Sequence, residues 1–374
     1  MKAMIKGVGL TKIDQHWSKS IGELAAEACF KALRDAGNPK IDAIVVGNMM
    51  SGLLNGQENL GAHIAESIGM SGIPAIKIEA ACGSGGAAVM WGAIGVISGI
   101  FRNVLVVGVE KMTDATNTED QSSALATASD AETELSMGAT FAALNAIIMR
   151  RYMHEHGLSE EDFSHLPILM HKNAADVEHA QLRYRISLKD YLESPYVCEP
   201  LRLLDASPTG DGAAAIIIGE EGDVEIAGFG SSTDLVETFS RDLTELRAVK
   251  SAAKKAMEMA SIELSDLDII QIHDAFSVIG YMCVEAIGVV ERGKAHRFFE
   301  SGDAERNGYL PINPEGGLKA RGHPVGATGV YQVAEIALQL MERAGPSQVE
   351  GARIGLSVNI GGTGSNVTAI VLKR

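Results

Sequence analysis

The stretch MIKGVGLTKID at residues 4–14 recurs in altered form as VEIAGFGSSTD at residues 224–234, and this repeat decides the fold. Each copy is a short apolar run with glycine at alternate positions, followed by polar residues and an aspartate. An amphipathic helical pattern, a polar loop and a buried apolar run then follow each copy, at 21–51 and at 243–277. The two halves of the chain are therefore predicted to be duplicates.

Two later pairs of segments extend the repeat. RNVLVVGVEKM at 102–112 matches ARIGLSVNIGGTG at 352–364, and DGAAAIIIGEE at 211–221 matches GSNVTAIVLKR at 364–374. Apolar strands that alternate with helices are typical of mostly parallel sheets covered by helices on both faces. We therefore expect an α/β fold in which two duplicated βαβ-type halves pack together.

The repeat is interrupted once, by a long polar and partly helical segment. We place this insertion at residues 113–210 and expect it to form a loop or cap domain, because long insertions in compact folds usually carry binding surfaces. The N-terminal half then comprises residues 1–112 and 211–222, and the C-terminal half comprises residues 223–374. Six basic side chains of the insertion form a local positive patch or solvated surface charge: Arg150, Arg151, Lys172, Arg183, Arg185 and Arg202.

Composition narrows the class of protein. The formal net charge of −16 argues against binding to nucleic acid or to anionic membranes, since the overall field repels polyanions. No apolar run reaches the roughly 18 residues of a membrane span. The four cysteines have no CxxC spacing, and no secretory leader precedes them, which predicts a cytoplasmic, reduced protein with no metal site.

Cys82 is a candidate nucleophile within AIKIEAACGSGGAAVMWGAIGVISG at residues 75–99. The pattern predicts a strand that gives way to a glycine-rich helix just after this cysteine. Unpaired N–H groups and the helix dipole at a helix start favour a thiolate, so we expect a reactive thiol here.

Three further segments carry chemistry. His273 follows the predicted strand DIIQI, at the carboxyl end where open α/β sheets collect ligand sites. His323 lies among glycines in GGLKARGHPVGATG at 316–329, ahead of a predicted helix. A strand in GLSVNIGGTGSN at 355–366 ends in glycines whose N–H groups are suited to binding an oxyanion.

These four motifs occur in the order and spacing of the thiolase superfamily, which the chain resembles over essentially its full length. The resemblance implies a five-layered αβαβα structure with an inserted loop domain. HDAF at 273–276, in place of NEAF, makes the chain similar to the sterol-carrier-protein-linked branch and to archaeal acetoacetyl-CoA thiolases.

The resemblance also implies a role for each motif. Cys82 would accept an acyl group from a coenzyme A thioester, and His323 would be the general base and contribute to an oxyanion hole. His273 would complete that oxyanion hole, with acid/base work as an additional role, and the backbone N–H groups of Cys82 and Gly361 would form a second. Coenzyme A thioesters would be substrates, with no prosthetic group and no metal; the residues that bind coenzyme A are not identified.

One departure from the family pattern stands out. The second cysteine that thiolases use as acid/base is replaced by Asn359 in one motif and by Ala275 in the other. Three explanations remain: a histidine moves the α-proton, Cys283 reaches the site, or the chain has lost condensation chemistry. Cys283 lies about two and a half turns along the helix after HDAF, roughly 13 Å or more away by helical rise.

The function that this resemblance implies is reversible condensation of two acetyl-CoA to acetoacetyl-CoA, which feeds mevalonate and isoprenoid synthesis. Longer 3-ketoacyl-CoA cleavage, decarboxylating ketoacyl synthesis and a non-catalytic acyl-CoA-binding subunit are the alternatives. By the same analogy we expect a homodimer or homotetramer. A complex with 3-hydroxy-3-methylglutaryl-CoA synthase and a small zinc-ribbon and OB-fold protein is also expected.

Overall fold

The computed structural model describes residues 1–115 and 117–374, and it contains a nine-stranded mixed sheet that runs through both halves. The strands of this sheet are β1 (Met4–Leu10), β2 (Ala43–Gly47), β3 (Ala75–Ile78), β4 (Asn103–Glu110), β7 (Gly212–Gly219), β8 (Val224–Thr233), β9 (Ile269–Gln271), β10 (Ile354–Gly361) and β11 (Asn366–Lys373). The longer helices are α1 (Ile21–Asp35), α3 (Leu60–Ser67), α4 (Ser84–Ile97), α6 (Phe141–His156), α7 (His165–Ala174), α9 (Arg247–Ala260), α10 (Ser277–Ile287) and α12 (Thr328–Leu340).

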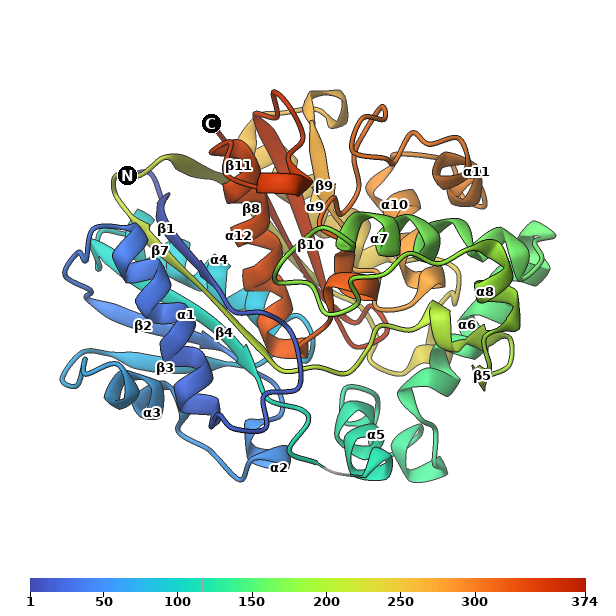
Figure 1. Ribbon diagram of the computed structural model, residues 1–374, viewed down its shortest axis with the longest axis horizontal. Helices are drawn as coiled ribbons and strands as arrows, with labels where there is room; N and C mark the ends of the chain where they lie inside the picture. The colour runs from blue at the N-terminus through green and yellow to red at the C-terminus, as the bar shows by residue number, and fades with distance from the viewer. Residues whose placement is uncertain (116) are drawn as a thin grey trace.

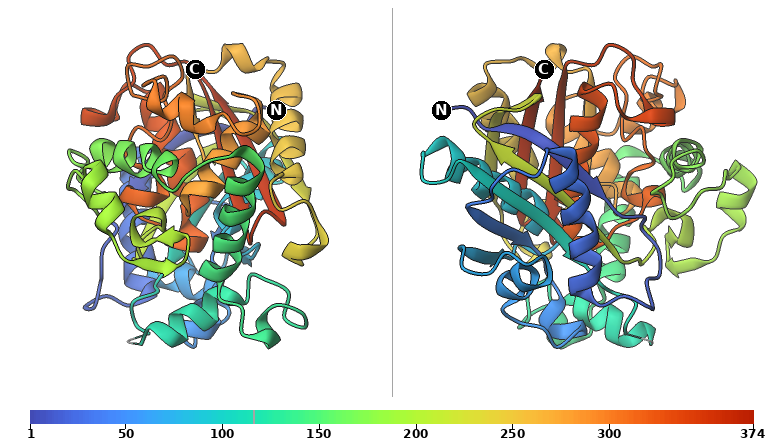
Figure 2. Two further views of the ribbon diagram at one scale, coloured as in Figure 1. Left: turned by 90° about the vertical axis from the view of Figure 1, so that its right-hand side faces the viewer. Right: turned by 60° about the vertical axis from the view of Figure 1, so that its left-hand side comes forward.

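The predicted duplication is visible in the strand order β3-β2-β4-β7-β1-β8-β11-β10-β9. Read outward from the centre, β1, β7, β4 and β2 of one half match β8, β11, β10 and β9 of the other. The halves join where Met4 pairs with Glu225 and Ile5 with Val224. Figures 1 and 2 show the blue N-terminal half beside the orange and red C-terminal half.

The expectation of mostly parallel sheets is wrong. Within the nine-stranded sheet of the described residues, five of the eight strand pairings are antiparallel and three are parallel. The reason is the way in which the last strand of each half arrives. β11 returns from β10 through a tight glycine turn, and β7 returns after the long excursion of residues 113–210, so both insert antiparallel beside their neighbours.

The glycines of the repeat allow a helix to lie directly on each central strand. A Cβ atom placed on Gly7 of β1 would come within 2.5 Å of the carbonyl oxygen of Ala32 in α1, and one on Gly228 of β8 would come closer still to that of Ala256 in α9. Real Cβ atoms do not approach backbone so closely, because cores are close-packed. The alternating glycines therefore serve the same packing function in both halves.

Helices and sheet alternate in layers. α1 and α3 pack on the outer face of the N-terminal strands, and α9 and α10 on the outer face of the C-terminal strands. α4 and α12 lie between the two halves, in contact with each other and with strands from both. These layers agree with the five-layered arrangement that the family resemblance implied.

The insertion contains most of the remaining elements. These are α5 (Thr118–Ala126), α6, α7, α8 (Leu188–Glu193) and the small hairpin β5 (Tyr196–Cys198) and β6 (Leu201–Arg202), with α2 (Ser51–Leu54) and α11 (Ala295–Glu300) outside it. α6 and α7 pack against α10, as the green ribbons beside the orange ones show in Figure 1. The C-terminal end of the insertion returns to the core, where the backbone N–H of Ser207 donates a hydrogen bond to the carbonyl of Ala275.

Four of the six basic side chains of the insertion form ion pairs. Arg150 lies 3.5 Å from Glu199, Arg151 2.6 Å from Glu155, Lys172 2.7 Å from Glu305, and Arg202 2.8 Å from Glu160. For these four, the alternative of surface charge applies, because nearby carboxylates neutralise them.

Candidate active site

Cys82 lies in a tight turn between β3 and α4. Ala81, just before it, has a φ of 50°, a conformation that residues with a Cβ rarely adopt. The Ser84 hydroxyl closes the turn, since it accepts from the Ala80 N–H at 2.9 Å and donates to the Ala81 carbonyl at 2.6 Å. Strain of this kind gathers at functional sites and persists only where the surroundings hold it.

The thiol of Cys82 is protonated at rest, contrary to the expectation of a helix-start thiolate. Only 3% of the residue is exposed, and burial raises its pKa to about 12, with the nearby Glu110 carboxylate adding to the shift. The helix begins at Ser84, so the cysteine stands just ahead of it rather than within its first turn. A nucleophilic Cys82 therefore needs a base to remove its proton.

His323 lies in the cavity wall together with Cys82. Its Nδ1 lies 2.7 Å from the hydroxyl of Thr328, at the start of α12, and that hydroxyl also lies 3.2 Å from the Pro324 carbonyl. Burial lowers the pKa of His323 well below its usual range, and His273 and Arg321 lower it further. A neutral imidazole of this kind can accept the thiol proton.

His273 is not among the residues that line the cavity, but it contacts His323. Its ring meets that of His323 edge-on, with the two ring centroids 5.2 Å apart. The backbone N–H of Ile360 points at His273 Nδ1 at 3.3 Å. Burial, followed by the charge of Arg321, lowers the pKa of His273 to about 3, so this imidazole is neutral as well.

Asn359 connects these parts, and sequence analysis did not foresee this role. Its Oδ1 accepts from the Gly86 N–H of α4 at 2.9 Å, and its Nδ2 donates to the Cys82 carbonyl at 3.0 Å. The same Nδ2 lies 3.4 Å from Nδ1 of His273. One fully buried amide thus holds the cysteine turn and the second histidine.

Gly361 lies against the same turn. A Cβ atom on Gly361 would collide with the carbonyl oxygen of Ala80, and one on Gly83 would lie 3.2 Å from the Gly361 nitrogen. Only glycine at these positions lets the end of β10 approach the cysteine turn this closely. The backbone of Gly361 is therefore beside Cys82.

A small cavity of about 80 Å³ lies over Cys82 and His323. Its other walls are mostly apolar and come from both halves and from the insertion, and they consist of Met112, Leu125, Phe141, Ser207, Pro208, Thr209, Ala275, Phe276 and Val325. A larger depression of about 720 Å³, lined by residues such as Glu263 and Tyr309, contains none of the predicted site residues. The chemistry of the motifs points to the small cavity.

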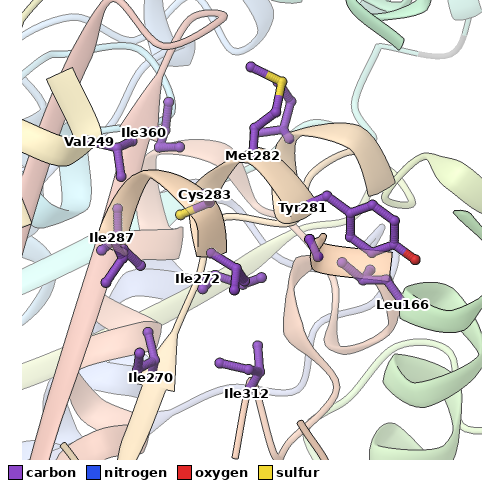
Figure 3. Close-up of a cluster of buried hydrophobic side chains, with 14 of the residues drawn as sticks. Leu166, Val249, Ile270, Ile272, Tyr281, Met282, Cys283, Ile287, Ile312 and Ile360 are labelled. Atoms are coloured by element: carbon purple, nitrogen blue, oxygen red, sulfur yellow. The ribbon is translucent and has the colours of Figure 1, made fainter. Parts of the chain in front are cut away.

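Cys283 is nearer to the site than helical rise suggested, but it does not enter the cavity. α10 folds back over β9, so the sulfur lies among apolar side chains that include Ile272 and Ile287, as Figure 3 shows. The backbone of His273 is close enough to affect the thiol, whose pKa burial raises to about 12. The cavity has Ala275, not a cysteine, in its wall.

Glu110, which sequence analysis overlooked, anchors the loops around the cavity. It is fully buried, and its two oxygens accept from the backbone N–H groups of Met49, Met50 and Gly326 and from the Asn48 amide, at 2.8–3.0 Å. Burial raises the pKa of Glu110 to about 7 despite these bonds. All four partners are donors, which satisfies an ionised carboxylate.

Two family models match nearly the whole chain. The model described as "Thiolase, N-terminal domain" matches residues 4–222, and "Thiolase C-terminal domain-like" matches residues 230–374. This chain belongs to the thiolase family. Among the described residues of this thiolase, no cluster of metal-binding side chains was found, and no helix has the length and hydropathy needed to cross a bilayer.

Individual relatives agree with this family. The thiolase is 41% identical over 379 residues to an acetyl-CoA acetyltransferase of Methanothermobacter thermautotrophicus, covering 98% of both chains. It is 30% identical to human sterol carrier protein 2, covering 99% of this chain and 71% of that protein. A solved structure titled "Ltp2-ChsH2(DUF35) aldolase" has the same fold, with a TM-score of 0.86 at 22% identity and coverage of 100% of this chain and 98% of that one.

Proposed function

We propose that this thiolase is an acetyl-CoA C-acetyltransferase that condenses two acetyl-CoA reversibly to acetoacetyl-CoA and coenzyme A. The observation that carries the proposal is the shared cavity of Cys82 and His323, a thiol and a neutral imidazole. Similarity to archaeal acetyl-CoA acetyltransferases at about 40% identity supports the same activity.

The first half-reaction transfers acetyl to the enzyme. His323 takes the proton of the Cys82 thiol, and the sulfur attacks the thioester carbon of acetyl-CoA. The carbon–sulfur bond to coenzyme A breaks, and the leaving thiolate receives the proton from His323. The backbone N–H groups of Cys82 and Gly361 would stabilise the oxyanion.

The second half-reaction forms the carbon–carbon bond. A second acetyl-CoA loses an α-proton to a base, and its carbanion attacks the carbonyl carbon of acetyl-Cys82. The bond from that carbon to the Cys82 sulfur breaks, acetoacetyl-CoA is released, and the proton returns to the sulfur. His273 would stabilise the enolate oxygen that forms when the second acetyl-CoA loses its α-proton.

The choice of acetyl rests on the volume and lining of the cavity. A volume of about 80 Å³, closed by the side chains of Met112, Leu125 and Phe141, suits a two-carbon acyl group better than a long chain. Cleavage of longer 3-ketoacyl-CoA is the second candidate, favoured by the similarity to sterol carrier protein 2.

Other parts of the proposal depend on analogy. The division into halves at 1–112 with 211–222 and at 223–374, with a loop domain at 113–210, is part of it. So are a cytoplasmic location, a role in isoprenoid synthesis, and assembly into a homodimer or homotetramer. A partner with a zinc-ribbon and OB-fold also belongs here, supported by a similarly folded chain whose structure title includes a DUF35 protein.

Steady-state assays that compare thiolysis of acetoacetyl-CoA with thiolysis of a longer 3-ketoacyl-CoA test the choice of substrate. Mass spectrometry of the protein after incubation with labelled acetyl-CoA tests acetylation of Cys82. We expect one acetyl group on Cys82 and a preference for acetoacetyl-CoA. A folded protein that carries no acetyl group would refute nucleophilic catalysis. A preference for the longer substrate would favour the second candidate.

A further inference from the structure

The two histidines of the site differ in what their Nδ1 atoms face. Nδ1 of His273 faces the backbone N–H of Ile360, and a backbone N–H can only donate. Nδ1 of His323 faces the hydroxyl of Thr328, which can donate or accept. This contrast bears on the family's missing second cysteine.

The environment of His273 admits one neutral tautomer. Because Ile360 donates to Nδ1, that nitrogen carries the lone pair, and the proton of the neutral ring is on Nε2. The side chain of Asn359 supports this arrangement. Its Oδ1 is fixed by the Gly86 N–H and its Nδ2 faces the Cys82 carbonyl, so the amide cannot turn round without losing both bonds.

The environment of His323 admits both tautomers. When the Thr328 hydroxyl points to the Pro324 carbonyl, its oxygen accepts from Nδ1–H, and Nε2 is free to take a proton. When the hydroxyl turns toward Nδ1, the imidazole proton lies on Nε2 instead. With the hydroxyl on the Pro324 carbonyl, the Nδ1–H tautomer of His323 takes a proton at Nε2, and the imidazolium ion so formed delivers that proton and returns to the neutral ring.

On the basis of the proposed function, we propose that Asn359 and Ile360 hold His273 as an Nε2–H donor. His323, whose tautomer the Thr328 hydroxyl does not fix, then moves both the thiol proton and the α-proton. Asn359 and Thr328 are then positioning residues. The α-proton passes from the methyl carbon of acetyl-CoA to Nε2 of His323, and from there to the Cys82 sulfur as the carbon–sulfur bond breaks. A second thiol is not needed.

Nitrogen NMR of the full chain labelled with ¹⁵N-histidine tests the tautomers without substrate. We expect His273, assigned by the loss of its signals in His273→Gln, to show a protonated Nε2 and an unprotonated Nδ1 at neutral pH. Asn359→Asp places an anionic oxygen near Nδ1 and should move the proton to that nitrogen. A wild-type protein with Nδ1 of His273 protonated would overturn the proposal, and this result does not depend on how the variant folds.

Kinetics test the shared base. Thr328→Val removes the hydroxyl at nearly constant volume, whereas Thr328→Ser keeps it, and Thr368→Val is a matched control in the neighbouring strand. We expect Thr328→Val to slow both Cys82 acetylation and α-hydrogen exchange of acetyl-CoA in D₂O about tenfold or more, a part of what general base catalysis contributes. Serine should restore both rates, and the control should leave them unchanged.

The outcomes separate the two proposals. If Cys82 is never acetylated in the wild type, the proposed function fails whatever the tautomers are. If Thr328→Val slows acetylation but leaves α-hydrogen exchange at the wild-type rate, another base moves the α-proton, and this inference is wrong while the function stands.

Discussion

The segments that precede α4 and α12 occupy equivalent places in the duplicated halves, yet they carry different chemistry. The turn before α4 presents Cys82, and the turn before α12 presents His323. Strain at Ala81 and the Ser84 hydroxyl hold the cysteine, whereas a threonine hydroxyl holds the histidine. Duplication thus supplied two similar turns, and each half alone has half of the site.

The two halves also neutralise their buried carboxylates differently. In the N-terminal half Glu110 is surrounded by N–H donors. In the C-terminal half Glu335 of α12 pairs with the fully buried Arg321 at 2.6 Å. The first arrangement uses backbone dipoles and the second uses a charge, so the two halves should respond differently to loss of the carboxylate.

The largest effect on activity should come from removing the reactive side chain of either turn. Cys82→Ala and His323→Ala should each lower kcat for acetoacetyl-CoA thiolysis by on the order of 10⁴-fold, because nucleophile and base act as a unit. The double variant should be no slower than either single one, which steady-state kinetics will show. Cys29→Ala is the matched control and should retain activity; additive losses in the double variant would contradict the shared role.

Replacing the buried carboxylate of each half should lower the free energy of unfolding by different amounts. Glu335→Gln leaves Arg321 buried without its charge partner and should lower the free energy of unfolding by about 3–5 kcal/mol. Glu110→Gln turns an NH₂ group toward N–H donors and should cost about 1–3 kcal/mol. Urea unfolding followed by circular dichroism measures both, and equal losses would show that the two environments are equivalent.

Alanine at the repeated glycines should test whether the halves pack alike. Gly7→Ala and Gly228→Ala each force a methyl group against a helix carbonyl, so each should cost about 1–3 kcal/mol of unfolding free energy. Ser232→Ala, on β8, is the control and should change stability by less than about 0.5 kcal/mol. A loss at only one glycine would mean that the other helix can shift away.

The smallest effect should be the pH dependence of stability that Glu315, in the C-terminal half, contributes. Burial, followed by the nearby Glu335, raises the pKa of Glu315 to about 7 from 4.5. The folded protein therefore holds this proton more tightly than the unfolded chain, and the resulting stability is lost as pH rises from about 4.5 to 7.

Glu315→Gln resembles the protonated form and should remove this loss. The variant should match the wild type at pH 4.5 to within about 0.5 kcal/mol and become the more stable protein as pH approaches 8. Urea midpoints at several pH values measure the difference. A difference in stability between variant and wild type that does not change with pH would be inconsistent with a proton held by Glu315 in the folded protein.

Local patterns in the sequence predicted much of the fold. The glycine alternation at Gly7 and Gly228 and the apolar periodicity identified the duplicated strands, because both signals depend only on neighbouring residues. Strand direction was predicted wrongly, since it depends on how β7 returns after the insertion. The helix predicted at the end of GGLKARGHPVGATG begins at Thr328, as expected.

The motifs of the site were predicted from the sequence, but the contacts between these motifs were not. Cys82 and His323 do share a cavity, whereas His273 does not line it and contacts His323. Asn359 bonds to Gly86 across 273 residues of chain, and no local pattern reports such a contact. Burial of Cys82, which sets its protonation, is likewise a property of the whole fold.

The order of the strands has a consequence for synthesis on the ribosome. β1, made first, pairs with β7, about two hundred residues later, so the N-terminal part of the sheet cannot be completed until the whole insertion has been translated. At about 5–20 residues per second this leaves the edge of β1 open for roughly 10–40 s, and the edge of β4 for about half as long. Both strands are apolar, and exposed apolar strand edges favour aggregation. The nascent chain is therefore more open to aggregation during this interval than after the insertion has been made.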